Sequence, residues 1–227
     1  MSPRSGALEI GGPADALIDE PLRLRARGAG TNAELRWRAR LRDDDGRIWR
    51  SAGDRPEELA LAWEPGKAST GPVAALRSLR PVVLEVRVDA ADGRGASRTL
   101  RRRLLAEGVR RRRWPGAGGA VLHLPVGEPC ATVIAEPDAA SELAAPLLAS
   151  RGVLCVLAAD AVEARRLLEQ VPGAGEPRVL AEGEMVLPPG IPARADAVGD
   201  PGARAAAWDA LLDSLGARPR GEDRRAG

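Results

Sequence analysis

The 227-residue sequence contains no Phe and no Tyr, one His, one Lys and two Cys. Without Phe and Tyr, the core has to be built from Leu, Val, Ala and the five Trp, and Leu buries less apolar surface than a large aromatic side chain. Two cysteines are too few for a disulfide framework or a cysteine-based zinc site. The single histidine, His123, leaves only one imidazole for acid–base catalysis.

Long apolar runs and a strong charge imbalance are absent as well. The longest apolar run, Val153–Ala159, is far too short to cross a bilayer, and Met1–Ile10 lacks the apolar core of a signal peptide. The 34 basic residues face 32 acidic ones, so the net charge is only +2. With 44% hydrophobic and 29% charged residues, the composition is that of a globular chain. We expect a cytoplasmic protein without a membrane span.

The two cysteines lie in apolar stretches of the sequence. Cys130 precedes Ala131–Ala135, and Cys155 lies between Leu154 and Val156. Both are interpreted as small buried side chains that pack like other apolar residues. A disulfide between them is the less favoured alternative, because disulfides are rare in the cytoplasm.

Alternating apolar and polar residues predict strands in the first half of the chain. In Leu35–Arg42 and in Val82–Asp89 every second residue is apolar, which places one face on a core and the other in water. Asp43–Gly46 and Asp92–Gly93 are turn signals that come after these two runs. Further strands are expected at 22–27, 47–51 and 97–105. Short alternating strands separated by turns indicate a β-sandwich.

Many of these strands carry arginines on their polar face, which we interpret as a solvated sheet face. No nucleic-acid partner is expected, because acidic residues lie close by and the aromatic side chains that stack on bases are nearly absent. The most basic stretch, Arg110–Arg113, would attract phosphates by its charge, but an exposed linker explains it equally well.

After Trp114 the pattern changes to alternating strands and helices. Strands are expected at 120–124, 131–135 and 152–158, and helices at 139–150, 161–171 and 203–215. Pro146 argues for a kink in the first helix or for a shorter helix. This order favours an α/β layer. We therefore place a β-sandwich at 8–113, an α/β domain at 114–217 and a disordered tail at 218–227.

Several segments, spread from about residue 8 to residue 216, are informative as a set because of the order in which they follow one another. They are 13–22, 43–51, 71–81, 108–110, 124–125, 147–153, 188–192 and 205–209. In this order they resemble the acyl-CoA thioester hydrolase / bile acid-CoA:amino acid N-acyltransferase family. The resemblance implies an immunoglobulin-like β-sandwich followed by an α/β-hydrolase domain. It also implies a Cys or Ser nucleophile on a strand-to-helix elbow, together with an Asp and a His.

The catalytic residues implied by the resemblance are missing from their positions. The G-x-S-x-G or G-x-C-x-G elbow, whose sharp turn exposes the nucleophile, does not occur in the sequence. Neither cysteine has the flanking glycines, and the same holds for Ser141 and Ser150. Glu184 stands at the position of the family's catalytic His. A carboxylate with an ordinary pKa is a poor base for a thiol or hydroxyl.

The loop that would stabilise an oxyanion also departs from the family. Glu136-Pro137-Asp138 replaces a glycine-rich turn, and Pro137 has no N–H to donate. Between Ala159 and Glu176 there is room for one helix only, which indicates an internal deletion of the elbow region. His123 is interpreted as a half-buried histidine on an early strand.

These observations leave three hypotheses. The leading one is a truncated, catalytically impaired family member that binds an acyl-CoA or another acyl thioester and needs no cofactor or metal. The first alternative is an active thioesterase or esterase with non-standard residues, for which Cys130, His123 and Glu184 are the candidates. The second is a non-enzymatic interaction protein, because a shortened sheet leaves an edge that pairs with a second copy or another protein.

Overall fold

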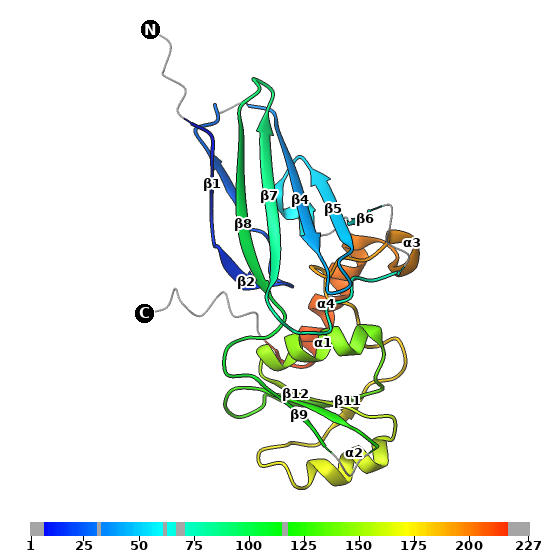
Figure 1. Cartoon of the computed structure of the whole chain (residues 1–227). Coiled ribbons are helices and arrows are strands. Elements are labelled where there is room, and N and C mark those ends of the chain that lie inside the picture. Colours follow the sequence, from blue (N-terminus) through cyan, green and yellow to red (C-terminus); the bar gives the residue numbers. More distant parts are fainter. Residues whose placement is uncertain (1–6, 31–32, 61–62, 67–70, 115–117, 218–227) are drawn as a thin grey trace. The chain divides into compact units, whose positions relative to one another are not determined.

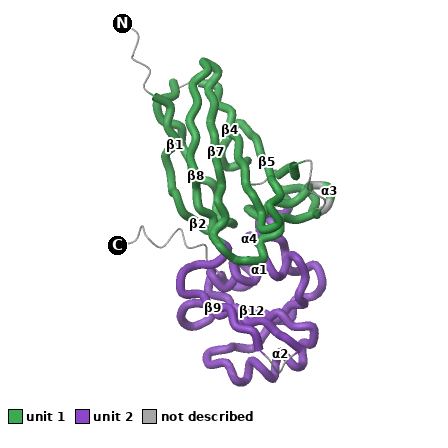
Figure 2. The backbone as a smooth tube through the Cα atoms, viewed as in Figure 1, with its two compact units in different colours: residues 1–103, 189–203 green, residues 104–188, 204–227 purple. Residues whose placement is uncertain are grey.

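The computed structural model describes residues 7–30, 33–60, 63–66, 71–114 and 118–217, so the tail expected at 218–227 lies outside the described residues. The fold is mixed and mostly β (Figure 1). Figure 2 shows two compact units, one made of Met1–Arg103 and Pro189–Ala203, the other of Leu104–Pro188 and Arg204–Gly227. Residues 104–113, which we placed in the first domain, thus belong to the second unit, and 189–203 return to the first.

The first unit contains a six-stranded sheet and a two-stranded sheet. The large sheet has the order β2 (Asp15–Leu17), β8 (Gly95–Arg103), β7 (Val82–Ala90), β4 (Leu35–Arg42), β5 (Ile48–Gly53) and β6 (Glu64–Pro65). All its neighbouring strands are antiparallel except the pair β2 and β8. The small sheet pairs β1 (Glu9–Gly11) with β3 (Arg25–Arg27). A short 3-10 helix, η1 (Pro56–Ala60), and α3 (Ala195–Val198) complete this unit.

The alternation predicted for β4 and β7 is confirmed. In β4, Trp37, Ala39 and Leu41 are buried and the arginines between them are exposed. Every second residue of β7 is buried in the same way. Because successive side chains of a strand point to opposite faces, the sheet has an apolar inner face and a polar outer face. Tryptophan fills much of the core, and Trp49 is completely buried.

The segment that returns to the first unit is held by close backbone contact. Val73 and Ala193 form an isolated antiparallel bridge. Gly190 is buried, and a Cβ at this position would collide with the backbone carbonyl of Ile18. Only glycine allows the two backbones to approach so closely.

The second unit contains a five-stranded sheet. Its order is β13 (Arg178–Val179), β11 (Ala131–Ala135), β12 (Val153–Leu157), β10 (Val121–Leu124) and β9 (Arg110–Arg113). The first two neighbouring pairs are parallel and the last two antiparallel. Helix α1 (Ala139–Ser150) joins β11 to β12, and α2 (Ala161–Leu168) comes after β12. Helix α4 (Pro201–Ser214) begins in residues of the first unit and ends in the second. Within the described residues, no helix is long and apolar enough to cross a membrane.

Helix α1 has the predicted bounds and runs through Pro146, so the shorter helix is wrong. Asp138 and Ser141 form a capping box, in which Asp138 Oδ1 accepts a hydrogen bond from the Ser141 N–H at 2.6 Å and Ser141 Oγ accepts one from the Asp138 N–H at 2.8 Å. A capping box satisfies backbone donors that the first helical turn leaves free. This box fixes the start of the helix.

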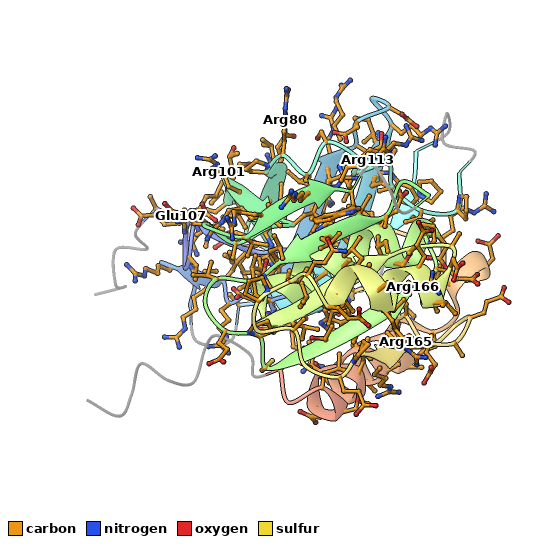
Figure 3. All side chains as sticks on the ribbon, turned by 90° about the horizontal axis from the view of Figure 1, so that it is seen from below. Arg80, Arg101, Glu107, Arg113, Arg165 and Arg166 are labelled. Carbon is orange, nitrogen blue, oxygen red and sulfur yellow. The ribbon has the colours of Figure 1, made fainter. Side chains whose placement is uncertain are left out.

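Two further expectations are corrected. Arg110–Arg113 is not a linker: it forms strand β9, which pairs with β10 and leaves its four side chains exposed, as Figure 3 shows for Arg113. The Arg112 guanidinium also lies 4.7 Å from the centre of the Trp114 ring, a cation–π contact. Cys130, which precedes β11, is exposed and not buried as expected. Cys155, in the middle of β12, is buried as predicted. Both are free cysteines, so they form no disulfide with each other.

Candidate functional site

His123 lies on β10, directly opposite Cys155 of β12 and Arg111 of β9. Opposite residues of antiparallel strands share a face of the sheet, so the imidazole and the Cys155 thiol are neighbours. Their strand neighbours Leu122 and Val156 belong to the core that packs on α2. His123 and Cys155 therefore point to the other face of the sheet, where α1 lies (Figure 1).

The environment of His123 makes it a weak base. His123 is fully buried, at 1% exposed, and not half-buried as expected, because it lies on an inner strand of the sheet. Its Nδ1 has no hydrogen-bond partner in the described structure. Burial lowers the pKa of His123 to about 4, and the positive charge of Arg111 contributes to this lowering. In a catalytic triad the Nδ1–H of the base is held by a carboxylate, and no described carboxylate holds it in this chain.

The Cys155 thiol is equally unsuited to nucleophilic attack. Burial is the main cause that raises the pKa of Cys155, and the neighbouring Cys130 raises it further. The thiolate is the reactive form of cysteine, and burial in apolar surroundings disfavours it. Cys155 and His123 are thus side by side as a neutral thiol and a neutral imidazole. This pairing depends on the strand order, which no local sequence pattern reveals.

Glu184 comes after β13 in the chain and is exposed. Its Oε2 accepts a hydrogen bond from the Ala181 N–H at 2.6 Å, and its Oε1 pairs with Arg178 Nη2 at 2.8 Å. The hydrogen bond from Ala181, and after it the contact with Arg178, hold the pKa of Glu184 below its ordinary value. Because a base with a lowered pKa accepts protons less readily, Glu184 is a poorer base than an isolated glutamate. It closes the turn after β13 instead.

Cys130 lies at the start of β11, where its N–H donates to the Gly152 carbonyl at 2.9 Å. Its Sγ lies 4.0 Å from the Arg151 carbonyl oxygen. Among the residues that the structure describes, no hydrogen bond or ion pair joins Cys130, His123 and Glu184 to one another. The three candidate residues are held by different neighbours and form no catalytic chain.

The turns that lead from strands into helices carry capping aspartates. Between β11 and α1 the cap is Asp138, and between β12 and α2 Asp160 accepts from the Val162 N–H at 2.8 Å. An elbow would present Ser or Cys at such a turn, next to free backbone donors. At the first turn Pro137 has no N–H, and the N–H of Asp138 donates to Ser141 Oγ.

The two serines near these turns are structural. Ser141 is buried, and its Oγ also donates to the Glu136 carbonyl at 2.8 Å. Ser150 is buried at the end of α1, where its Oγ donates to the Pro146 carbonyl at 2.7 Å and accepts from the Ala106 N–H at 2.8 Å. Buried hydroxyls with these bonds stabilise the helix ends and are not free to attack a substrate.

The described residues contain no group of three or more His, Cys, Asp or Glu side chains that could hold a metal ion. No protein-family model matches the sequence, and no curated protein matches it significantly. The geometry of the second unit is therefore the main guide to function.

Proposed function

We propose that this chain is a catalytically impaired relative of the acyl-CoA thioester hydrolase / bile acid-CoA:amino acid N-acyltransferase family that binds an acyl thioester without hydrolysing it. In this proposal the strands of the first unit correspond to the family's immunoglobulin-like β-sandwich. The second unit corresponds to a shortened α/β-hydrolase domain. The shared order of the sequence segments supports the assignment.

The strand order of the second unit also supports it. An antiparallel hairpin, β9 and β10, is followed by β12 and β11, which are parallel and joined by α1. The sheet of an α/β-hydrolase begins with this same order of strands. In that fold the nucleophile comes after the next parallel strand, on a sharp turn into a helix.

We infer the loss of catalysis from the segment that follows β13, the parallel strand that comes after β12 in the chain. Strand β13 has only two residues, and it is followed by a turn that Glu184 closes instead of by an elbow and a helix. The region between β12 and β13 contains α2 alone. A shortened sheet without an elbow supports the loss of hydrolysis.

Acyl-CoA binding tests the proposal. The purified full chain is titrated with saturated acyl-CoA thioesters of increasing chain length by calorimetry, and the thioester is quantified by chromatography afterwards. We expect saturable binding that depends on chain length, with the thioester intact. Absence of binding across the series would contradict the proposal.

Self-association is a second candidate, favoured by one feature of the same sheet. Among the described strands, β13 pairs only with Val133 and Ile134 of the five-residue strand β11. An incompletely paired edge strand is a template for another strand. Sedimentation at micromolar concentration distinguishes the two cases: a dimer supports this candidate and a monomer excludes it.

A further inference from the structure

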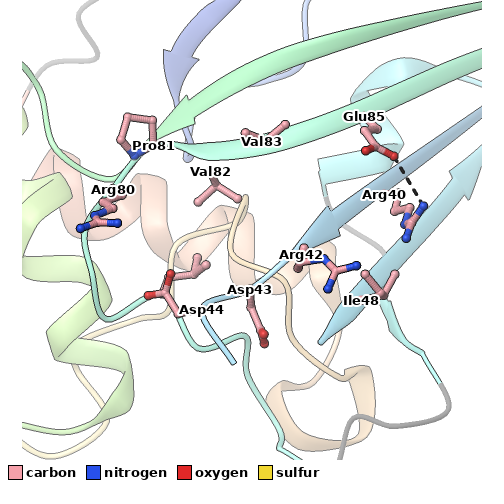
Figure 4. A pocket seen from close by; sticks show the side chains of 11 residues that line it. Arg40, Arg42, Asp43, Asp44, Ile48, Arg80, Pro81, Val82, Val83 and Glu85 are labelled. Carbon is pink, nitrogen blue, oxygen red and sulfur yellow. Dashed lines mark ion pairs between the residues drawn. The ribbon is translucent and has the colours of Figure 1, made fainter. Parts of the chain in front are cut away.

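A cavity of about 430 Å³ lies on the first unit, over the end of β4 and the starts of β5 and β7 (Figure 4). Its volume is within the range of small-molecule sites, roughly 300–1,000 Å³. Arginines, carboxylates and apolar side chains line it together. Among them are Arg42, Asp43, Asp44, Arg80, Pro81 and Val83.

The aspartates of the cavity are already engaged. Asp43 is buried, and its Oδ2 accepts hydrogen bonds from Trp49 Nε1 at 3.1 Å and from the Ala75 N–H at 3.2 Å. Asp44 accepts from the N–H and the hydroxyl of Ser78, at 2.8 and 3.0 Å. These bonds come from neutral donors, so both carboxylates keep their negative charge, but within the described residues neither forms an ion pair with Arg42 or Arg80.

The arginines of the cavity differ in their partners. Arg40 Nη1 lies 3.7 Å from Glu85 Oε2, the ion pair drawn in Figure 4. The guanidinium groups of Arg42 and Arg80 have no hydrogen bond or ion pair within the described part of the chain. Each guanidinium presents five N–H donors in a fixed planar arrangement that suits carboxylate and phosphate oxygens. Two sets of donors therefore face the cavity unused.

The position of Arg80 is fixed by its loop. Asp44 holds Ser78 through two hydrogen bonds, and the next residue, Leu79, has a φ of 53°. It is the only described non-glycine residue with a positive φ. Such a conformation is strained for a residue with a side chain, and such residues cluster at functional sites. The strained residue directly precedes Arg80 and Pro81, which both line the cavity.

An apolar strip lies beside these arginines. Val83 is 53% exposed, although the other outward residues of β7 are polar or charged. Pro81 lies just before β7, and Ile48 of β5, which also lines the cavity, lies opposite Arg42. A solvated sheet face does not require these apolar side chains. Together they offer a surface for the apolar part of a ligand.

The surrounding sheet face adds positive charge. Arginines on the outer face are Arg36, Arg38, Arg40, Arg42, Arg50, Arg87, Arg101 and Arg103, whereas the outward acidic residues are Asp15, Glu64, Glu85 and Asp89. An excess of one sign of charge raises the local concentration of oppositely charged ligands. The charged residues that line the cavity balance one another, so it is the surrounding face that favours the approach of anions.

We propose that this cavity binds a small amphiphilic anion, one phosphate or carboxylate group on an apolar body. The headgroup accepts hydrogen bonds from Arg42 and Arg80, and the apolar body lies against Ile48, Pro81 and Val83. The proposal rests on the cavity and the sheet face around it, and not on the function proposed above for the chain.

Hexyl phosphate is the probe that tests this site, in calorimetric titrations of the full chain at fixed ionic strength. Inorganic phosphate and hexyltrimethylammonium serve as the head-only and the opposite-charge probes. Hexyl phosphate is expected to bind at least tenfold more tightly than either, because only it uses both the guanidinium groups and the apolar strip. Equal binding of inorganic phosphate, or tighter binding of hexyltrimethylammonium, would overturn the proposal.

Variants locate the site. Arg42→Gln and Arg80→Gln are each expected to weaken hexyl phosphate binding about tenfold, the effect of losing one charge-assisted hydrogen bond. Arg36→Gln is the matched control, because Arg36 is an exposed, unpaired arginine on the same face of β4, about 20 Å from Arg42, within the part of the chain that the structure describes. An equal loss in the Arg36 variant would show non-specific attraction and refute the site.

The source of the headgroup is tested with vesicles. The competitor is a phosphatidylcholine vesicle that contains phosphatidic acid. If the site takes a soluble amphiphile, only the small amount of phosphatidic acid that is free in solution competes with hexyl phosphate, so the vesicles compete weakly. Binding to these vesicles without any binding of hexyl phosphate would replace the proposed ligand site by a membrane-facing surface and overturn the inference.

Discussion

Acidification is expected to destabilise the second unit through His123. The pKa of this imidazole is about 4 in the folded protein, against 6.5 for an exposed histidine. Below pH 6.5 the unfolded chain binds a proton that the folded chain does not, so stability is complete above pH 6.5 and is lost as the pH falls towards 4. The loss amounts to about 2 kcal/mol at pH 5 and approaches about 3 kcal/mol below pH 4.

Two measurements check this prediction. Because the sequence has one histidine, its ring resonance can be followed by NMR without further assignment, and it should titrate near pH 4. Urea unfolding of the wild type and of His123→Leu between pH 7 and pH 4.5 should show a steeper loss in the wild type. An imidazole that titrates near 6.5, or parallel losses in both proteins, would refute the reasoning.

Three further predictions concern the fold. Gly190→Ala should destabilise the chain by about 3 kcal/mol in urea unfolding, because its Cβ would meet a backbone carbonyl, whereas Gly30→Ala, with nothing within 4 Å, should be nearly neutral. A thiol reagent should modify Cys130 in the folded protein and Cys155 only after unfolding, so equal rates would contradict the observed burial. Asp138→Ala should cost about 1 kcal/mol through loss of the α1 cap, measured by thermal unfolding.

Local signals in the sequence were sufficient for the regular elements. The bounds of β4, β11 and α1 can be derived from alternation, from a short apolar run and from the helical spacing of apolar residues, all of which are encoded within a few residues. The mixed, mostly β fold could be predicted on this basis. The short strands β2, β6 and β13 could not, because two or three residues carry no periodic signal.

Features that depend on contacts between distant parts of the chain could not be predicted from the sequence. Strand β9 consists of four arginines with both faces exposed, so it forms by pairing with β10 and shows no alternation. The return of 189–203 to the first unit depends on the close approach of Gly190 to Ile18. The neighbouring positions of His123 and Cys155 depend on strand order in the same way. Glu184 is a candidate only through the family resemblance, and its pairing with Arg178 has no signal in the sequence.

The release of free CoA is the most direct test of a family relative that binds but does not hydrolyse. Purified wild type, Cys130→Ala and Glu184→Gln are incubated with the acyl-CoA thioesters that bind, with Glu182→Gln as a neighbouring exposed control. Free CoA is quantified by chromatography, since Cys130 would react with a thiol reagent. All four proteins should release CoA at the rate of the buffer blank. Release by the wild type that is abolished in Cys130→Ala or Glu184→Gln, but kept in Glu182→Gln, would contradict the account.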